Sequence, residues 1–246
     1  MMVESAARTG KRDLIDTTFD FRMDAGGRDP DLCSPTLRRY HRRLWSKPLP
    51  GGVVFTLSDQ TRHAYLHHRS EVGEFFLASD SVIHTLTNFA AMQSVVQDIP
   101  PSETDAFLAQ CYTIGGMMVF PGNRIDGKMT LNGARGFNRR IADRMDLTLE
   151  CIRRHYLGQD SPLAAVLARY SDFFALFGDF AGYVDFFLLQ DLVTEDLSAV
   201  RFFTPFDAFT TSPLPQELPA YVEYRRLSLE LVRARNLRIS SWDVTH

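Results

Sequence analysis

Apolar residues recur at helical spacing along several stretches of the chain and form one short continuous run near its middle. Ser34 and Pro35 open a predicted helix with a hydroxyl cap and a proline at its first position, and apolar residues at helical spacing continue to Trp45. The short apolar run at residues 112–120 predicts a buried strand, and residues 53–57 predict another. Residues 64–77 are compatible with either a strand or a helix.

The second half of the chain has a mainly helical pattern. Further helices are predicted at residues 82–96, 102–111, 134–157, 162–177, 183–192 and 221–238. A proline-rich irregular stretch occupies residues 201–219. The pattern therefore predicts an α+β fold, with a mainly helical C-terminal half and a small mixed or antiparallel sheet contributed by the N-terminal half.

No composition shift or linker divides the chain of 246 residues, so we expect a flexible N-terminus at residues 1–16 and a single α+β domain at residues 17–246. Apolar residues make up 45% of the sequence, which is ample for a packed core. The net charge of -3 gives no overall field that would attract nucleic acid or an acidic membrane. The basic residues are 24 arginines and only three lysines, namely Lys11, Lys47 and Lys128.

Cysteine usage and hydropathy indicate the cellular setting. The cysteines are odd in number, widely spaced and outside any CxxC pattern, which favours a reducing compartment; they are Cys33, Cys111 and Cys151. The first residues lack the apolar core of a signal peptide, and no apolar run approaches the roughly 20 residues of a membrane-spanning helix. We therefore expect a soluble cytoplasmic protein without a membrane partner.

A glycine-rich cationic loop at residues 121–140 follows the predicted buried strand and precedes a predicted helix. Backbone N–H groups at glycines, a helix N-terminus and positive side chains together suit an anion. The predicted ligand-binding residues are Asn123, Arg124, Asp126, Lys128, Asn132, Arg135 and Arg139. The alternative is that the Asn and Asp side chains satisfy turn backbones while the arginines pair with acidic neighbours.

The same loop departs from the known phosphate-binding loop. Gly122 and the pair Gly127-Lys128 have the separation of the GxxxxGK[ST] motif. However, Met129 stands where that motif requires a hydroxyl for magnesium. The loop is therefore interpreted as a site for a phosphate or carboxylate, without nucleotide hydrolysis.

Two residues are candidates for proton transfer. On a helix that begins near Ser81, His84 would share a face with Asn88 and could act as a base. Asp185 lies in an otherwise apolar predicted helix, where a buried carboxylate needs a partner. The alternatives are that His84 faces solvent or makes a buried hydrogen bond, and that Asp185 pairs with an arginine of the cationic loop.

Other clusters have less distinctive chemistry. His63, His67 and Glu71 would share a face and could hold a metal only if their segment were helical, and its β-leaning composition argues against this. The phenylalanines at 173–187 are interpreted as core instead of a base-stacking platform. Basic and aromatic residues at 40–47 and 224–238 could contact RNA, although acidic residues dilute the second stretch. No metal or cofactor is assigned.

Several long segments together carry a resemblance to a known family. They are SPTLRRYHRRLWSKPLP, LASDSVIHTLTNF, the run from YTIGGMMVFPGNRIDGKMTLNGARGFNRR to ECIRRHYLG, and FGDFAGYVDFFLLQDLV with FFTPFDAF. The chain resembles an uncharacterised family of bacterial proteins, a domain of unknown function, over residues 16–239. The resemblance implies a single cytoplasmic bacterial domain and no particular activity.

Two hypotheses of function follow from the residues. In the first, the protein is an enzyme that acts on a nucleotide or another anionic small molecule, with Arg124, Lys128 and Arg135 holding the anion and His84 or Asp185 transferring protons. In the second, it is a non-catalytic binding or regulatory domain whose polar loop engages RNA or an acidic protein. The residues favour the first hypothesis, because the polar groups form compact clusters between apolar elements. They specify neither a substrate nor an oligomeric state.

Overall fold

The computed structural model describes residues 14–60 and 65–246, and its sheet is a four-stranded antiparallel meander. The strands are β1 (Ser58–Gln60), β2 (Tyr65–Ser70), β3 (Gly73–Ser81) and β4 (Met117–Pro121), hydrogen-bonded in that order. A tight turn connects β2 to β3, and Gly73 there has a φ of 128°, a region that favours glycine. The ambiguous residues 64–77 therefore form most of a hairpin from Tyr65 onward.

The helices confirm the predicted division of the fold. The α-helices of the described residues are α1 (Pro30–Cys33), α2 (Pro35–Trp45), α3 (Gln93–Val96), α4 (Pro101–Cys111), α5 (Leu131–Phe137), α6 (Met145–Tyr156), α7 (Ala164–Arg169), α8 (Ser171–Ala175), α9 (Phe180–Phe186) and α10 (Leu218–Thr245). Short 3-10 helices are η1 (Phe21–Met23), η2 (Ala90–Met92), η3 (Ile114–Gly116) and η4 (Gln190–Leu192). The sheet belongs to the N-terminal half and the C-terminal half is helical, as the sequence predicts.

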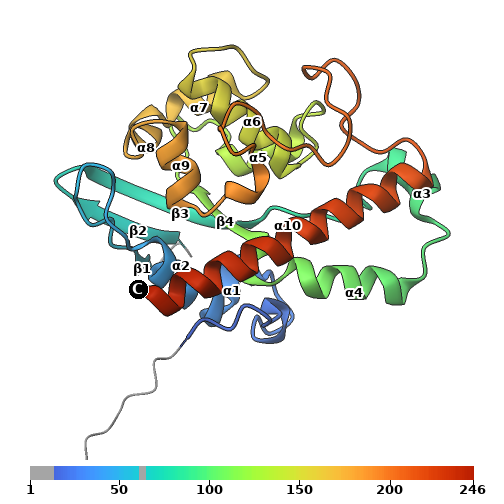
Figure 1. Ribbon diagram of the computed structural model, residues 1–246, viewed down its shortest axis with the longest axis horizontal. Helices are drawn as coiled ribbons and strands as arrows, with labels where there is room; N and C mark the ends of the chain where they lie inside the picture. The colour runs from blue at the N-terminus through green and yellow to red at the C-terminus, as the bar shows by residue number, and fades with distance from the viewer. Residues whose placement is uncertain (1–13, 61–64) are drawn as a thin grey trace, which may run out of the picture.

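The long helix α10 crosses the middle of the molecule (Figure 1). In this view α5 to α9 lie above it and α1 and α4 below it, while the β2–β3 hairpin projects at the left. α10 contacts α3, α4, η3 and η4, so it joins segments from both halves of the chain. α1 packs on β3 and α5 packs on β4.

Arg235 of α10 is fully buried and attaches that helix to the sheet. Its Nη1 donates to the main-chain oxygens of Gly115 and Met117, at 3.0 Å and 2.7 Å. Its Nε and Nη2 donate to the oxygens of Leu188 and Phe187, at 3.2 Å and 3.0 Å. One side chain therefore satisfies carbonyls of η3, β4 and the turn after α9, which would otherwise be buried without partners.

Helix α2 begins and ends as its sequence predicts. The Ser34 hydroxyl accepts a hydrogen bond from the Leu37 N–H at 3.0 Å, and Pro35 is the first helical residue. The helix buries Leu37, Tyr40, His41, Leu44 and Trp45 along one face. This amphipathic spacing anchors the N-terminal part of the chain in the core.

The predicted helix at residues 82–96 is wrong over most of its length. Only η2 and α3 are helical, and Leu86 has a φ of 59°. The main-chain oxygens of His84 and Thr85 accept hydrogen bonds from the hydroxyls of Tyr224 and Tyr221 on α10. These tertiary hydrogen bonds hold the segment as a loop against α10, which overrides its local helical preference.

Two longer predicted helices are each interrupted. The helix expected at 134–157 is divided into α5 and α6 by a turn in which Ala142 and Asp143 have φ values of 47° and 61°. The helix expected at 162–177 becomes α7 and α8, which meet at Tyr170. The helix expected at 183–192 is α9, which begins earlier because the Asp179 carboxylate caps the Gly182 N–H at 2.8 Å, and then η4.

Smaller predictions differ at the element ends. Residues 53–57 form only an isolated bridge between Pro48 and Val54, and the strand begins at Ser58. The predicted strand at 112–120 is confirmed from Met117 onward, because residues 114–116 form η3. The helix predicted at 102–111 is α4, which begins at Pro101 and has no side-chain cap at Pro100.

The buried side chains form one hydrophobic cluster that extends from Ile15 to Ile239. The predicted aromatic stripe belongs to it, since Phe173, Phe174, Phe177, Phe180, Phe186 and Phe187 are all buried. Residues 1–13 of the predicted flexible N-terminus lie outside the described residues. Within the remainder of that segment, Ile15 is buried and its N–H donates to Asp243 at 2.7 Å, so residue 15 is held against α10.

A buried ion pair fixes the irregular segment before α10. Arg144 and Asp146, at the start of α6, pair with each other. Arg144 also donates to the Thr204 hydroxyl and to the Pro213 oxygen at 2.6 Å, and Asp146 accepts from the Phe203 N–H at 2.8 Å. The proline-rich stretch is therefore attached to α6 at three points.

Candidate functional site

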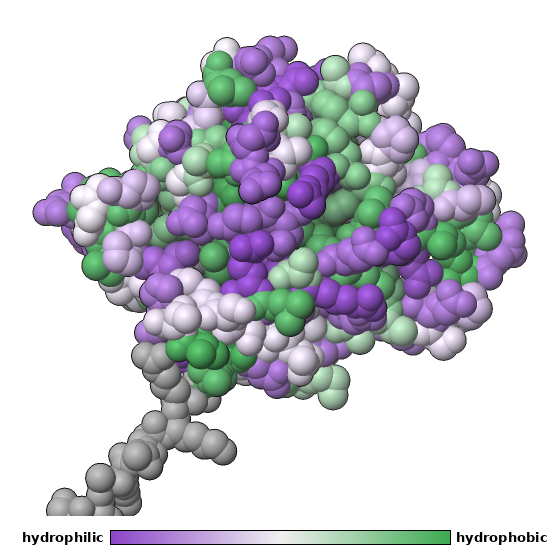
Figure 2. Space-filling model, viewed as in Figure 1, coloured by the Kyte–Doolittle hydropathy of each residue, from purple (hydrophilic) through white to green (hydrophobic). Residues whose placement is uncertain are grey.

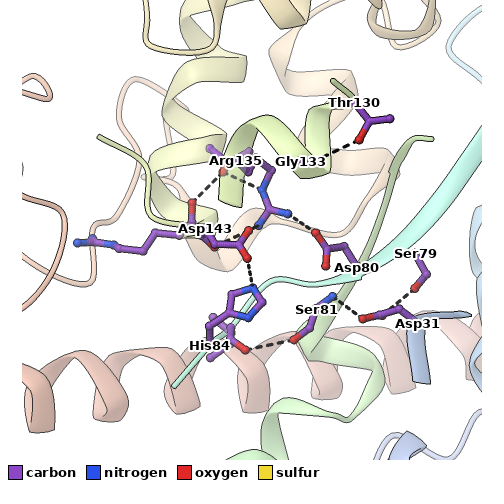
Figure 3. A network of polar contacts seen from close by, with 12 residues as sticks. Asp31, Ser79, Asp80, Ser81, His84, Thr130, Gly133, Arg135 and Asp143 are labelled. Carbon is purple, nitrogen blue, oxygen red and sulfur yellow. Dashed lines mark hydrogen bonds and ion pairs between the residues drawn. The ribbon is translucent and has the colours of Figure 1, made fainter. Parts of the chain in front are cut away.

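Arg135 of α5 is at the centre of a polar network (Figure 3). Its side chain is fully buried, and its Nη1 donates to the Asp80 carboxylate at 2.7 Å. Its Nε donates to the Thr148 hydroxyl at 3.0 Å, and its Nη2 lies 3.3 Å from Asp143 Oδ1. The guanidinium also covers the Phe120 ring. Arg135 therefore joins β3, α6 and the turn before α6.

His84, a predicted base, meets the same network from the opposite side of Asp143 (Figure 3). Its Nε2 lies 3.1 Å from Asp143 Oδ2. Burial lowers the pKa of His84 below its ordinary value, against the opposing effect of the Asp143 carboxylate, and Arg135 adds to the lowering. The expected pairing of His84 with Asn88 on a helix is wrong, because residue 84 lies in the loop after β3.

Acidic groups outnumber basic ones around Arg135. Burial raises the pKa of the Asp80 carboxyl to about 8, against the opposing effect of Arg135, and the carboxylates of Asp143 and Asp31 add to the rise. The side chains of Asp80, Asp143 and His84 are each about a quarter exposed, at 22%, 24% and 26%. The network can therefore exchange protons with solvent, although no pocket described below is lined by these residues.

A second branch of buried polar groups was not predicted. Asp31 of α1 accepts from the Ser79 hydroxyl at 3.1 Å and from the Ser81 N–H at 3.2 Å. Ser79 lies 2.9 Å from Nε2 of His41, whose Nδ1 accepts from the Trp45 indole at 3.1 Å. The available signal was the position of His41, a polar residue on the apolar face of the predicted helix.

The predicted anion loop does not gather its side chains around a common cavity. Arg124, Asp126 and Lys128 are exposed, as is Arg139 after α5. Asn123 is half-buried, and its main-chain oxygen accepts from the Tyr170 hydroxyl at 2.7 Å. The loop is thus attached to the helical half by its backbone while its charged side chains point to solvent.

The later part of the predicted loop forms the start of α5. The Thr130 hydroxyl accepts from the Gly133 N–H at 3.3 Å and caps the helix. Asn132 is half-buried in the first turn. Arg135, three residues further along α5, points into the core, so the helix N-terminus and this guanidinium do not face one ligand.

Asp185, the other predicted proton donor or acceptor, lines a pocket of about 770 Å³. We name it the Lys47 pocket; its walls come from the end of α2, the following turn, α9 and the end of α10, with Arg43, Lys47, Asp185, Phe186, Trp242 and His246 among them. Asp185 is exposed and accepts from the Gln190 amide at 3.2 Å, so the expected salt bridge with an arginine of the loop is absent. Arg43 and Lys47 belong to the basic stretch at 40–47 that was predicted as a possible RNA contact, and Trp242 and His246 were not predicted as site residues.

Lys47 lies among aromatic rings in this pocket. Its Nζ is 4.9 Å from the ring centre of Phe186 and 5.4 Å from those of Trp45 and Trp242. It donates one hydrogen bond to the Phe186 main-chain oxygen. Burial lowers the pKa of the Lys47 amine to about 8, against the opposing effect of Asp185, and Arg235 adds to the lowering.

Arg43 and the end of α10 complete the wall. The Arg43 guanidinium lies 2.7 Å from the Asp243 carboxylate, which also accepts from the Ile15 N–H. The Trp242 and His246 rings stack with their centres 5.2 Å apart. The pocket therefore combines cationic groups, aromatic faces and one exposed carboxylate, the composition that small-molecule sites use for binding and orientation.

Within residues 14–60 and 65–246, no group of three or more His, Cys, Asp and Glu side chains is placed to hold a metal ion. The helical register required for a metal site at His67 and Glu71 does not form, because β2 and its turn occupy that segment; His63 lies outside the described residues. No helix in the described part is both long and apolar enough to cross a bilayer.

The comparisons with known proteins identify a family that covers most of the chain, and they do not point to one site. Comparison with curated proteins and with solved structures gave no match. A family profile, in contrast, covers residues 15–239, which include the sheet, the Arg135 network and α10 as far as Ile239. The chain therefore belongs to the family of unknown function DUF6994.

Proposed function

We propose that this chain is a bacterial cytoplasmic enzyme that acts on an anionic small molecule, a nucleotide or another phosphorylated or carboxylated compound, bound in the Lys47 pocket. The observation that carries the proposal is the pocket itself. Its volume of about 770 Å³ falls within the range of roughly 300–1,000 Å³ that is usual for ligand sites. It is lined by two basic side chains, aromatic rings and the candidate proton-transfer residue Asp185.

Each wall of the pocket has a role in the proposal. Lys47 and Arg43 attract the anionic group, and the ion pair with Asp243 fixes the position of the Arg43 guanidinium. Phe186 and Trp242 offer apolar contact to the remainder of the ligand. Asp185 is exposed, so its carboxylate is free to exchange protons with a bound substrate and with solvent.

The pocket is a better site than the predicted loop. Arg124 and Lys128 are exposed in a high-dielectric environment, where a single contact with an anion is worth little. Arg135 has no exposed side-chain surface, and two carboxylates, Asp80 and Asp143, already pair with its guanidinium. The Arg43 side chain also has a carboxylate partner, but it is 33% exposed and lines the cavity. Lys47 is partly buried beside a cavity, where an added anion would be less screened.

The basic stretches that suggested RNA binding are largely neutralised. On α10, Arg226 pairs with Glu223 and Glu230, and Arg238 pairs with Asp191. On α2, Arg42 pairs with Asp59. The face that carries α10 is a mixture of hydrophilic and hydrophobic residues (Figure 2). Because basic side chains of α2 and α10 are paired with acidic ones, these helices present no continuous positive surface for RNA phosphates. A small-molecule enzyme is therefore favoured over an RNA-binding domain.

The proposed cytoplasmic setting is supported by the cysteines. Cys33, Cys111 and Cys151 are all free thiols, which suits a reducing compartment. Burial raises the pKa of Cys111 and of Cys151 to about 12, so neither thiol is reactive.

Thermal-shift measurements against nucleotides, sugar phosphates and 2-oxo acids test the proposal. A ligand at about one hundred times its Kd stabilises the native state by about 2.7 kcal/mol, which raises the Tm of a protein of this size by roughly 5–10 °C. We expect such a shift for the wild type, its loss in Lys47→Gln, and its retention in Lys128→Gln. The second variant makes the same change on an exposed lysine outside the pocket.

Other results of these measurements would place the ligand elsewhere or support RNA binding. Loss of the shift in Lys128→Gln but not in Lys47→Gln would return the ligand to the loop at 121–140. No shift with any of these anions, together with salt-sensitive retention of RNA, would contradict the enzyme proposal and support the RNA-binding alternative.

A further inference from the structure

The pocket contains a lysine at position 47, where an arginine would bind an anion equally well. Of its 27 basic residues only three are lysines, and one of them, Lys47, lies in the pocket. A guanidinium stays protonated in proteins, whereas a lysine amine can lose its proton and become a nucleophile. The amine at this position therefore offers chemistry that the 24 arginines do not.

The contacts of Lys47 leave its amine available. Among the described residues, its Nζ forms no ion pair with a carboxylate, and its one hydrogen bond goes to the Phe186 main-chain oxygen. Asp185 acts on it only as a nearby charge on the same pocket wall. An ion-paired ammonium would be held in its protonated form, so the absence of such a pair favours reactivity.

We propose that Lys47 is a nucleophilic amine that forms an imine with the carbonyl group of an anionic substrate, a 2-oxo acid or a phosphorylated aldehyde. The inference rests on the proposed function, because it takes the Lys47 pocket as the ligand site. Arg43 binds the carboxylate or phosphate, and the carbonyl carbon lies at Nζ. The substrate class is thereby narrowed from anions in general to anions with an aldehyde or ketone.

Two features of its surroundings act in opposite directions on the protonation of the Lys47 amine. Burial lowers the pKa of the amine to about 8, so a useful fraction is neutral near physiological pH. The three ring faces around Nζ act in the opposite direction, because they stabilise a cation. They also hold the side chain at a fixed place beside the cavity, which orients the amine for attack.

The reaction is balanced without any further reagent. The neutral amine adds to the carbonyl carbon, and an amine proton moves to the oxygen to give a carbinolamine. The C–O bond then breaks as the hydroxyl takes a second proton and leaves as water. The product is a protonated imine on Lys47, so one carbonyl compound, one amine and one proton give one iminium and one water. Asp185 lines the same pocket, and its exposed carboxylate can pass this second proton from solvent to the leaving hydroxyl.

Borohydride trapping with glyoxylate tests the inference. Reduction converts an imine into a stable secondary amine, which peptide mass spectrometry assigns to Lys11, Lys47 or Lys128. We expect Lys47 to be labelled about tenfold faster than Lys128 at pH 8, with a labelling midpoint well below the ordinary lysine pKa of about 10.4. Acetaldehyde, which lacks the carboxylate, should label Lys47 more slowly than glyoxylate.

Two variants distinguish the reactivity of the Lys47 amine from its positive charge. Lys47→Arg keeps the positive charge and should retain the thermal shift given by anions, but it should yield no adduct at this position. Lys47→Gln should lose both the thermal shift and the adduct. The labelling of Lys128 should be the same in both variants, which controls for the general reactivity of the reagent.

The outcomes distinguish this inference from the proposed function. Equal labelling of Lys47 and Lys128 overturns the inference. A thermal shift lost in Lys47→Gln and kept in Lys47→Arg, without an adduct at Lys47, overturns the imine and leaves the anion site standing. Selective labelling of Lys47 by both aldehydes, with no thermal shift by any anion, supports the nucleophilic amine and overturns the anion site.

Discussion

His84 and Arg135 contact opposite oxygens of one carboxylate, that of Asp143. His84 Nε2 lies 3.1 Å from Oδ2, and Arg135 Nη2 lies 3.3 Å from Oδ1. Both were selected from the sequence, one as a base and the other as an anion-binding group, yet the residue that connects them was not. Asp143 has a φ of 61° in the turn between α5 and α6, so the network depends on a left-handed backbone conformation, which aspartate adopts more readily than most residues other than glycine.

Replacing Arg135 with Met should destabilise the protein by about 3–5 kcal/mol, because it leaves the Asp80 and Asp143 carboxylates without their guanidinium. The loss should be smaller at pH 5 than at pH 8, since the raised pKa of Asp80 lets that carboxyl take up a proton instead. Urea denaturation at the two pH values measures both effects.

Arg139→Met is the matched control, because it removes an exposed arginine from the same loop. We expect its free energy of unfolding to stay within about 0.5 kcal/mol of the wild type. Equal losses in the two variants would show that the network around Arg135 does not stabilise the fold.

His41 should make the protein sensitive to acid. Burial lowers its pKa to about 3, and the charges of Arg235 and Arg38 add to the lowering. Between pH 3 and the unfolded value of about 6.5, the unfolded state therefore binds more protons than the native state. The stabilising contribution of neutral His41 is complete above that range and falls by about 3 kcal/mol between pH 7 and pH 4.

The variant His41→Gln isolates this contribution. The stability difference between wild type and variant should shrink by that amount as the pH falls, because glutamine does not titrate. Asp31 acts in the opposite direction, since burial raises its pKa to about 6, but it is present in both proteins. His246→Gln, at an exposed position, controls for loss of an imidazole. Parallel pH profiles for wild type and His41→Gln would contradict the prediction.

Gly116 is required by close packing between η3 and α4. A Cβ atom at this position would lie 1.9 Å from the main-chain oxygen of Cys111 and 2.9 Å from its carbonyl carbon. Gly116→Ala should therefore cost about 3 kcal/mol or more, because backbone atoms must move. Gly51→Ala, where nothing lies within 4 Å of the added carbon, should be neutral. Thermal unfolding of both variants provides the measurement, and similar Tm values would refute the clash.

Replacing Arg235 with Met should cost about 3 kcal/mol or more, because several buried carbonyl oxygens lose their donor. Arg233→Met changes an exposed arginine on the same helix, whose Nε donates to Gln110 at 2.9 Å, and should cost little. Chemical denaturation of the pair measures the difference. A stable Arg235→Met variant would mean that water replaces the guanidinium.

The sequence predicted those parts of the fold that depend on local signals. The cap at Ser34 and the proline at 35 placed α2 correctly, and the apolar run near residue 117 placed β4. The loop at 82–89 was predicted as a helix because its shape depends on the hydroxyls of Tyr221 and Tyr224, more than 130 positions away. No local pattern carries such a contact.

The candidate site was predictable only in fragments. Asp185 was selected because a carboxylate in an apolar helix is unusual, and it does line the Lys47 pocket. Lys47 was predicted only as part of the basic stretch at 40–47, since a lysine at a helix end is ordinarily solvated. The surroundings of Lys47 are distinctive because the rings of Phe186 and Trp242 lie beside its amine. These residues belong to helices distant in sequence, and only the tertiary structure brings them together.

The position of Arg235 late in the chain has a consequence for biosynthesis. It donates to main-chain oxygens of residues 118 and 120 positions earlier. Ribosomes release the N-terminal part first, so β4 and η3 emerge long before the guanidinium that completes their hydrogen bonding. A nascent chain stalled ahead of residue 235 should thus remain sensitive to proteases and bound by chaperones, and the core should close only after α10 has left the exit tunnel.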